Sequence, residues 1–186
     1  MARHRFLAVV AAAMAAVVLA ACTSKESPSV TVSGKTKQDT LNQVRELQAQ
    51  VNQYGAQFRE AVGGAAPNPG SVRVGPTPCP GKTSDVADDG SFYVSGGWQL
   101  NLDPARQIST IRAVRDAWQT KGYKIVLYEE FDNGTRARLE GEDSANGYSF
   151  SIISTNPPTA VGIRVLSTCV KPADGEFPGD SITIYQ

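Results

Sequence analysis

The sequence predicts an α+β fold with two layers, in which two helices pack on one face of an antiparallel sheet. Three observations support this prediction. Residues 37–62 repeat apolar side chains at spacings of three and four, which predicts an amphipathic helix, and residues 104–121 do the same. Between residues 123 and 169, apolar and polar residues alternate in runs separated by turn sequences, which predicts a four-stranded meander.

The first helix carries a single apolar stripe. Its members are Val44, Leu47, Val51, Tyr54, Phe58 and Ala61. Thr36 and Asp39 have the spacing of a capping box, and Gly63 ends the run. The stripe packs either on the core of the domain or on a partner helix in a coiled coil. Because the repeat lasts under four heptads and includes bulky aromatic residues, we favour the core.

The next segment, residues 63–90, is predicted to be loop-rich, with extended and turn conformations, because proline and glycine are frequent in it. A strand is expected at 91–100. One face of this strand carries Phe92, Val94, Trp98 and Leu100. The pair Gly96-Gly97 predicts a bulge or bend within it.

The second helix, 104–121, begins with an N-cap and a proline. Asp103 is a good N-cap residue, and Pro104 suits the first helical position. Its apolar side comprises Ile108, Ile111, Val114, Ala117 and Trp118. Gly122 is expected to end the helix.

The meander is predicted from its turns and its alternation. The sequences Asp132-Asn133-Gly134 and Asn146-Gly147 favour tight hairpin turns. In the second strand, Arg136, Arg138, Glu140 and Glu142 alternate with small or apolar residues, so one face of the sheet is expected to meet water. The alternation from Val161 continues by twos to Cys169, which places that cysteine on the core side.

The amino terminus has the features of a secretory leader. Residues 1–21 begin with basic residues and continue as an apolar stretch, too short to span a bilayer. The run from Leu19 to Cys22 is a lipobox, which predicts cleavage after Ala21 and lipidation of Cys22. Two acyl chains would then anchor the protein to the membrane.

We expect the processed chain to have three parts. Residues 22–36 form a flexible tether, because apolar residues are scarce there. Residues 37–172 form a single α+β domain. Residues 173–186 form an extended tail rich in proline, glycine and aspartate, in which Ile182, Ile184 and Tyr185 could dock as a short edge strand.

Two cysteines remain after lipidation of Cys22, namely Cys79 and Cys169. In an exported protein such a pair is expected to form a disulfide, the alternative being two separate buried thiols. Because the alternation puts Cys169 on the core side of the sheet, we expect the disulfide to lie beneath the helices. Closing a loop of about 90 residues is worth about 4–5 kcal/mol in the chain-entropy model.

Composition narrows the chemistry. His4 is the one histidine among 186 residues and leaves with the leader, so we expect no histidine-activated nucleophile and no histidine-ligated metal. Without Arg3 and Arg5 the chain has 16 basic and 18 acidic residues, a net charge of −2. We therefore expect no nucleic-acid partner, and we assign no cofactor, metal or catalytic residue.

Several weaker patterns in the sequence have simpler structural interpretations. The carboxylates Glu129, Glu130, Glu140 and Glu142 gather near one hairpin. Their alternation with arginines favours a solvated sheet face with cross-strand ion pairs over a glycosidase pair. Asp85, Asp88 and Asp89 suit a polar turn better than a calcium loop. A groove lined by Trp98 and Tyr128 is a further, minor possibility.

The order of these features resembles the LppA-type lipoproteins of mycobacteria and related actinobacteria. The resemblance is based on the lipobox, the two cysteines, the helix from Asp103 to Gly122, the run Asn146 to Phe150 and the proline-rich tail around Pro178. The positions that it carries over are the lipidated Cys22 and the cysteine pair Cys79 and Cys169. It implies no activity, since fold analogy alone does not establish one.

The sequence therefore predicts a lipoprotein of undefined role, anchored through Cys22 to the extracytoplasmic face of the cell membrane. The main hypothesis is a non-enzymatic module that binds another envelope component, with a protein as the expected partner. The second is a carrier of a small hydrophobic or glycan ligand, held in a pocket between helix 104–121 and the sheet. An enzyme that uses carboxylates alone is the third.

Overall fold

The computed structural model describes residues 36–64, 66–81, 85–179 and 182–185. The leader expected at 1–21, the lipidated Cys22 and nearly all of the expected tether lie outside these residues. The helices are α1 (Lys37–Ala61) and α2 (Pro104–Thr120). The strands are β1 (Arg73–Pro78), β2 (Phe92–Asn101), β3 (Lys124–Phe131), β4 (Arg136–Asp143), β5 (Tyr148–Ser154), β6 (Ala160–Leu166) and β7 (Ile184–Tyr185).

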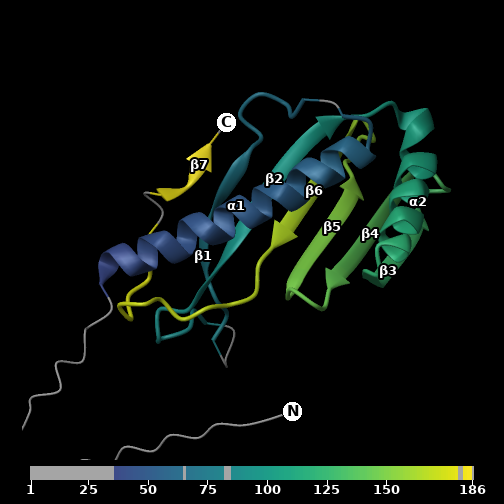
Figure 1. Cartoon of the computed structure of the whole chain (residues 1–186). Coiled ribbons are helices and arrows are strands. Elements are labelled where there is room, and N and C mark those ends of the chain that lie inside the picture. The colour runs from purple at the N-terminus through teal and green to yellow at the C-terminus, as the bar shows by residue number, and fades with distance from the viewer. Residues whose placement is uncertain (1–35, 65, 82–84, 180–181, 186) are drawn as a thin grey trace, which may run out of the picture. The chain divides into compact units, whose positions relative to one another are not determined.

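The strands form one antiparallel sheet in the order β3-β4-β5-β6-β2-β1-β7. Both helices lie on the same side of it (Figure 1): α1 crosses β1, β2 and β6, and α2 covers β3 and β4. The predicted α+β class, the two helices and the four-stranded meander β3 to β6 are confirmed.

Helix α1 begins at the predicted capping box. The Thr36 hydroxyl accepts a hydrogen bond from the Asp39 amide, and the Asp39 carboxylate accepts one from the Thr36 amide at 2.7 Å. The stripe residues Val44, Val51 and Phe58 are almost fully buried in the core of the sheet. The core interpretation of the stripe is therefore confirmed.

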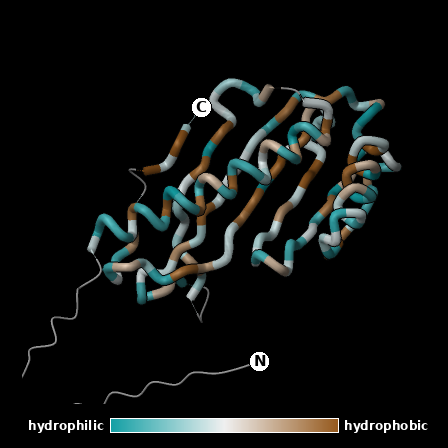
Figure 2. The backbone as a smooth tube through the Cα atoms, in the orientation of Figure 1, coloured by the Kyte–Doolittle hydropathy of each residue, from teal (hydrophilic) through white to brown (hydrophobic). Residues whose placement is uncertain are grey.

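An aromatic cluster fills the space between the helices and the sheet. The Trp118 ring of α2 lies 4.4 Å from the Phe150 ring of β5, and Phe150 lies 4.9 Å from Phe58 of α1. Figure 2 shows the underlying pattern, with hydrophobic and hydrophilic residues alternating along the strands. This alternation puts one apolar face of the sheet under the helices.

Two local predictions were wrong. Residues 73–78 form β1 inside the segment predicted to be loop-rich, and they pair with β2 along its length. The Gly96-Gly97 pair makes no bulge, since the register of β2 runs through it unbroken on both sides. Gly96 is instead required by packing: a Cβ there would lie 2.5 Å from both the Trp98 indole and a methyl group of Val51.

The predicted disulfide joins Cys79 to Cys169. Its expected position was wrong in part, because Cys79 is buried but Cys169 is exposed. Ser167 pairs with Val94, and Val170 pairs with Phe92, so the chain after β6 advances three residues while β2 advances two. That extra residue breaks the alternation and turns Cys169 outward.

The C-terminal segment contributes the last strand of the sheet. As expected, Ile184 and Tyr185 form an edge strand, β7, which pairs with β1. The Gln48 side chain of α1 donates hydrogen bonds to the backbone oxygens of Val74 and Ile182, at 3.2 and 2.7 Å. One buried amide therefore links α1, β1 and the C-terminal segment.

Candidate functional site

The side of the sheet opposite the helices, here called the open face, carries the main candidate site. Its side chains are the polar half of the strand alternation. The members used below are Ser95, Gly97 and Gln99 of β2, Gly162 and Arg164 of β6, Ser149 and Ser151 of β5, and Arg138, Glu140 and Glu142 of β4. Neither described helix covers this face, because both pack on the other one.

One row of cross-strand partners runs over the whole open face. In order, the row is Tyr185, Arg73, Gly97, Arg164, Ser151, Glu140 and Leu127. Neighbouring strands are about 4.8 Å apart, so Arg73 and Arg164 stand on either side of Gly97 with their backbones about 10 Å apart.

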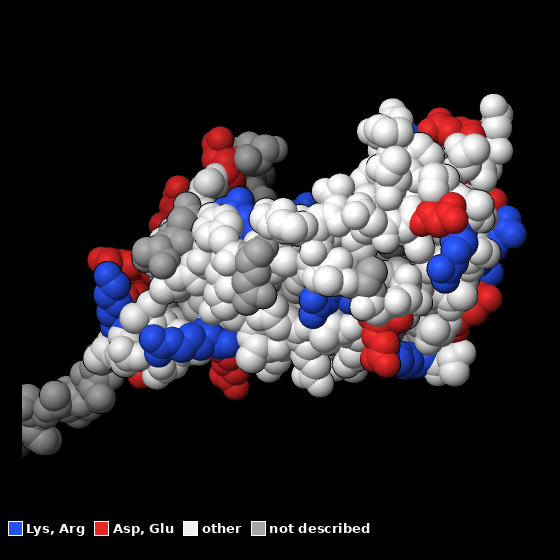
Figure 3. All heavy atoms as spheres, turned by 90° about the horizontal axis from the view of Figure 1, so that it is seen from above, with Lys and Arg blue, Asp and Glu red and all other residues white. Residues whose placement is uncertain are grey.

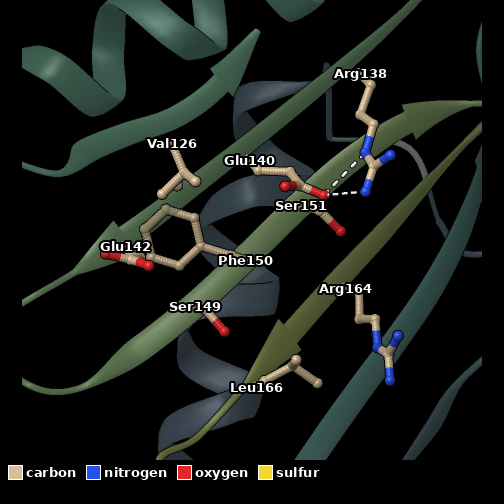
Figure 4. A pocket seen from close by; sticks show the side chains of 10 residues that line it. Val126, Arg138, Glu140, Glu142, Ser149, Phe150, Ser151, Arg164 and Leu166 are labelled. Carbon is tan, nitrogen blue, oxygen red and sulfur yellow. Dashed lines mark hydrogen bonds and ion pairs between the residues drawn. The ribbon is translucent and has the colours of Figure 1, made fainter.

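Most of the charges on this face are paired. Arg138 donates two hydrogen bonds to the Glu140 carboxylate, as the dashed lines in Figure 4 show. Lys124 lies 3.3 Å from its cross-strand partner Glu142. Arg164 is different: it is exposed and has no hydrogen bond or ion pair to any residue that the structure describes, and in Figure 4 its guanidinium stands apart.

A hollow of about 620 Å³ opens over β1, β2, β6, β5 and β4. Its charged lining residues are Arg73, Arg138, Arg164 and Glu140, so arginines outnumber carboxylates by three to one. A smaller hollow of about 260 Å³ adjoins it over β4 to β6 and shares Arg138, Glu140, Ser151 and Arg164 (Figure 4). On the surface seen in Figure 3, by contrast, small groups of both signs are scattered over a mostly uncharged surface.

The floor of the larger hollow contains two glycines that packing does not explain. A Cβ on Gly97 would meet nothing within 4 Å, and one on Gly162 would make only ordinary contacts with Ile153, at 3.7 Å or more. Both stand on the open face, where they leave bare backbone between larger side chains. The sequence pointed to Gly97, but as part of a bulge rather than as the floor of a hollow.

A third hollow, of about 370 Å³, lies on the helix side, where α1 meets the β4–β5 turn. It is lined by tyrosine and amide side chains, and its polar groups bond to one another. The Tyr54 hydroxyl donates to the Asp143 carboxylate at 2.6 Å, and the Tyr148 hydroxyl donates to Gln50. Asp143 also accepts from the Ala145 amide and from the side chain of Asn146, which ties it to the hairpin turn.

The predicted carboxylate group is divided between the two faces of the sheet. Glu140 and Glu142 lie on the open face, whereas Glu130 points toward α2 and accepts two hydrogen bonds from Arg112, at 2.6 and 2.8 Å. These hydrogen bonds hold the pKa of Glu130 below its usual value. A glycosidase acid needs a raised pKa, so Glu130 does not suit that role.

The aspartates at 85, 88 and 89 lie in the segment just after Cys79, where the Ala87 amide donates a hydrogen bond to the Cys79 carbonyl. Asp89 accepts a hydrogen bond from the Ser91 amide at 3.1 Å and lies 3.2 Å from the Lys171 ammonium. Bonding to Ser91, with a smaller contribution from Lys171, lowers the pKa of Asp89 to about 2. Within the described residues no group of three or more Cys, His, Asp or Glu side chains could hold a metal ion.

The two aromatic residues proposed to line a groove are far apart in the sheet. Trp98 is on β2 and Tyr128 is on β3, with β6, β5 and β4 between them. The space between α2 and the sheet is filled by the Trp118 and Phe150 rings, both nearly buried. A ligand pocket between helix 104–121 and the sheet therefore gains no support.

The anchor is not tested by the described residues, since Cys22 lies outside them. Neither described helix is long and apolar enough to cross a membrane. No protein-family model, curated protein or solved structure matches this chain.

Proposed function

We propose that this chain is a lipoprotein of the cell envelope, anchored through Cys22, whose domain binds another envelope component through the open face of its sheet. The lipobox supports the anchor and the location. The binding role is non-enzymatic, since the processed sequence has no histidine and the described carboxylates with shifted pKa values have them lowered, not raised.

The observation that carries the proposal is Arg164, an exposed guanidinium without a partner among the described residues, in the middle of a polar, hollowed sheet face. Arg138, another arginine of this face, is held by Glu140. Guanidinium groups present five donors in a fixed plane and are well suited to binding surfaces. A polar surface of this kind can receive a partner that supplies acceptors.

Site-specific photo-crosslinking in the native membrane tests this proposal. A photoreactive residue is introduced at Ser151, in the centre of the open face, and in a matched chain at Gln119, on the exposed side of α2. We expect one dominant adduct from position 151 and none from 119. Equal adducts from both positions, or none above background from 151, would overturn the proposal.

A further inference from the structure

We propose that the bare floor between Arg73 and Arg164 is a binding site for a phosphoryl group. This inference rests on the proposed binding role of the open face and names the chemical class of ligand that the face receives. Its three supports are the unexplained glycines, the local excess of positive charge and the spacing of the two arginines.

The glycines are the first support. Glycine inside a strand weakens it, and where it is found it marks a bulge, a bend or the close approach of another group. Gly96 is explained by the Trp98 indole, and Gly75 by Thr183, whose side chain occupies the space of a Cβ. Gly97 and Gly162 have open space or ordinary contacts there, have no positive φ, and lie in an unbroken register. The remaining reason for a glycine at these two positions is that a ligand approaches the backbone closely there.

Charge is the second support. Three arginines and one glutamate line the hollow, on a chain whose predicted processed form has a net charge of −2. Arg138 is neutralised by Glu140, which leaves Arg73 and Arg164 to attract an anion. The Arg73 guanidinium lies over the Tyr185 ring, 5.9 Å from its centroid, a weak contact that leaves its N–H groups available to an anion.

Geometry favours a phosphoryl group over a carboxylate. A planar carboxylate presents its two oxygens to one side, which suits one bidentate guanidinium. The two arginines here line the hollow from the strands on either side of Gly97. A tetrahedral phosphate presents oxygens in several directions and, with a charge near −2, matches two guanidinium groups. Ser151 of β5 is the cross-strand partner of Arg164, and its hydroxyl group can supply a further hydrogen-bond donor.

Calorimetric titration of the full chain in a non-ionic detergent, with inorganic phosphate at constant ionic strength, tests the site. We expect saturable binding that Arg164→Gln weakens at least tenfold. Arg106→Gln removes an exposed arginine of α2 that has no side-chain partner among the described residues, and should change the affinity less than twofold. Equal losses in the two variants, or no binding beyond that of chloride, would overturn the inference.

Gly97→Val provides a second variant that is expected to fold normally. A valine there meets no neighbour at its Cβ and suits a strand, yet it fills the floor on which the phosphate would rest. We expect a melting temperature at least as high as that of the native chain, and no phosphate binding. A folded Gly97→Val chain that binds phosphate as tightly as the native chain would refute the site.

Further ligands identify the source of the phosphate. Competition by phosphatidic acid, but not by phosphatidylcholine, each supplied in mixed micelles of the same detergent, indicates a lipid headgroup. No competition by either lipid indicates a soluble phosphate. Succinate that binds as tightly as phosphate would overturn the phosphoryl assignment. The two proposals fail separately: a chain that crosslinks a partner but binds no phosphate overturns only the ligand class, and one that binds phosphate but crosslinks nothing overturns only the envelope partner.

Discussion

The indole of Trp98 lies against the backbone of α1 at Gly55, where an added Cβ would stand 2.5 Å from the indole Cζ2. On the same side of the sheet, Gly96 leaves room for the same ring. Two glycines from distant parts of the sequence thus accommodate one buried tryptophan, and α1 can approach the sheet closely only because both lack a side chain.

Gly55→Ala should therefore destabilise the protein, although alanine favours helices by about 1 kcal/mol over glycine. Trp98 is 3% exposed and has little room to move, so overpacking should cost about 1–3 kcal/mol. Urea unfolding followed by tryptophan fluorescence measures the change. The matched control is Gly97→Ala, where nothing lies in the way and strand stability should rise by about 0.5–1 kcal/mol. Equal effects of the two substitutions would contradict this account.

The disulfide should contribute strongly to stability because it closes a long loop. Cys79 and Cys169 are 90 residues apart, so removing the link is expected to lower the free energy of unfolding by about 4 kcal/mol. Urea unfolding with and without reductant gives the value. The chain with both Cys79→Ala and Cys169→Ala should be as unstable as the reduced protein and should not respond to reductant. If reductant still lowered the unfolding free energy of that double variant, the loss of stability would not come from this disulfide.

Asp143 should make stability depend on pH. The Tyr54 hydroxyl bond, followed by the Asn146 side chain and nearby amides, holds the pKa of Asp143 below its ordinary value, while burial opposes this. The unfolded chain therefore binds more protons in this range, so the contribution is complete above the ordinary pKa of about 3.9 and is lost as pH falls through the lower native pKa.

Two variants isolate this contribution. The difference in unfolding free energy between the native chain and Asp143→Asn should be largest at neutral pH and should shrink as the pH falls below about 4. Tyr54→Phe removes the 2.6 Å hydrogen bond and should raise the pKa of Asp143, measurable by NMR titration of its carboxyl carbon. If the difference in unfolding free energy between the native chain and Asp143→Asn stayed constant from neutral to acid pH, the charge of Asp143 would make no contribution to stability.

The sequence predicted the elements with strong local patterns and missed β1, which depends on distant contacts. The capping box at Thr36 and the N-cap at Asp103 are local, and both are confirmed. Strand β1 was missed because Pro76 and Pro78 argue against a strand. It forms nevertheless, because β2 on one side and β7 on the other supply partners from far along the chain.

The candidate site was hidden from the sequence for a similar reason. Arg73, Gly97 and Arg164 come from three strands, and only the sheet order β6-β2-β1 makes them neighbours. The wet face of β4 was predicted correctly, but its expected cross-strand pairing was only partly correct. Glu142 does pair across strands with Lys124, whereas Glu140 pairs with Arg138 of its own strand. Periodicity identifies which face a residue occupies, but not its neighbours on adjacent strands.

Gln48 should control how firmly the C-terminal segment is held. This glutamine is 6% exposed, and its amide donates to carbonyl oxygens of β1 and of Ile182. Gln48→Leu would leave these oxygens without their donor, at a cost of about 1–3 kcal/mol. Because β7 has only two residues and pairs with β1 alone, the loss should appear there first, as faster hydrogen exchange at Ile184 and Tyr185 than in β5.

The matched control is Gln53→Leu, which changes an exposed glutamine of the same helix. It should leave the unfolding free energy and the hydrogen exchange of β7 unchanged. If Gln48→Leu accelerated exchange equally in β5 and β7, the amide would support the whole fold and not the C-terminal strand in particular.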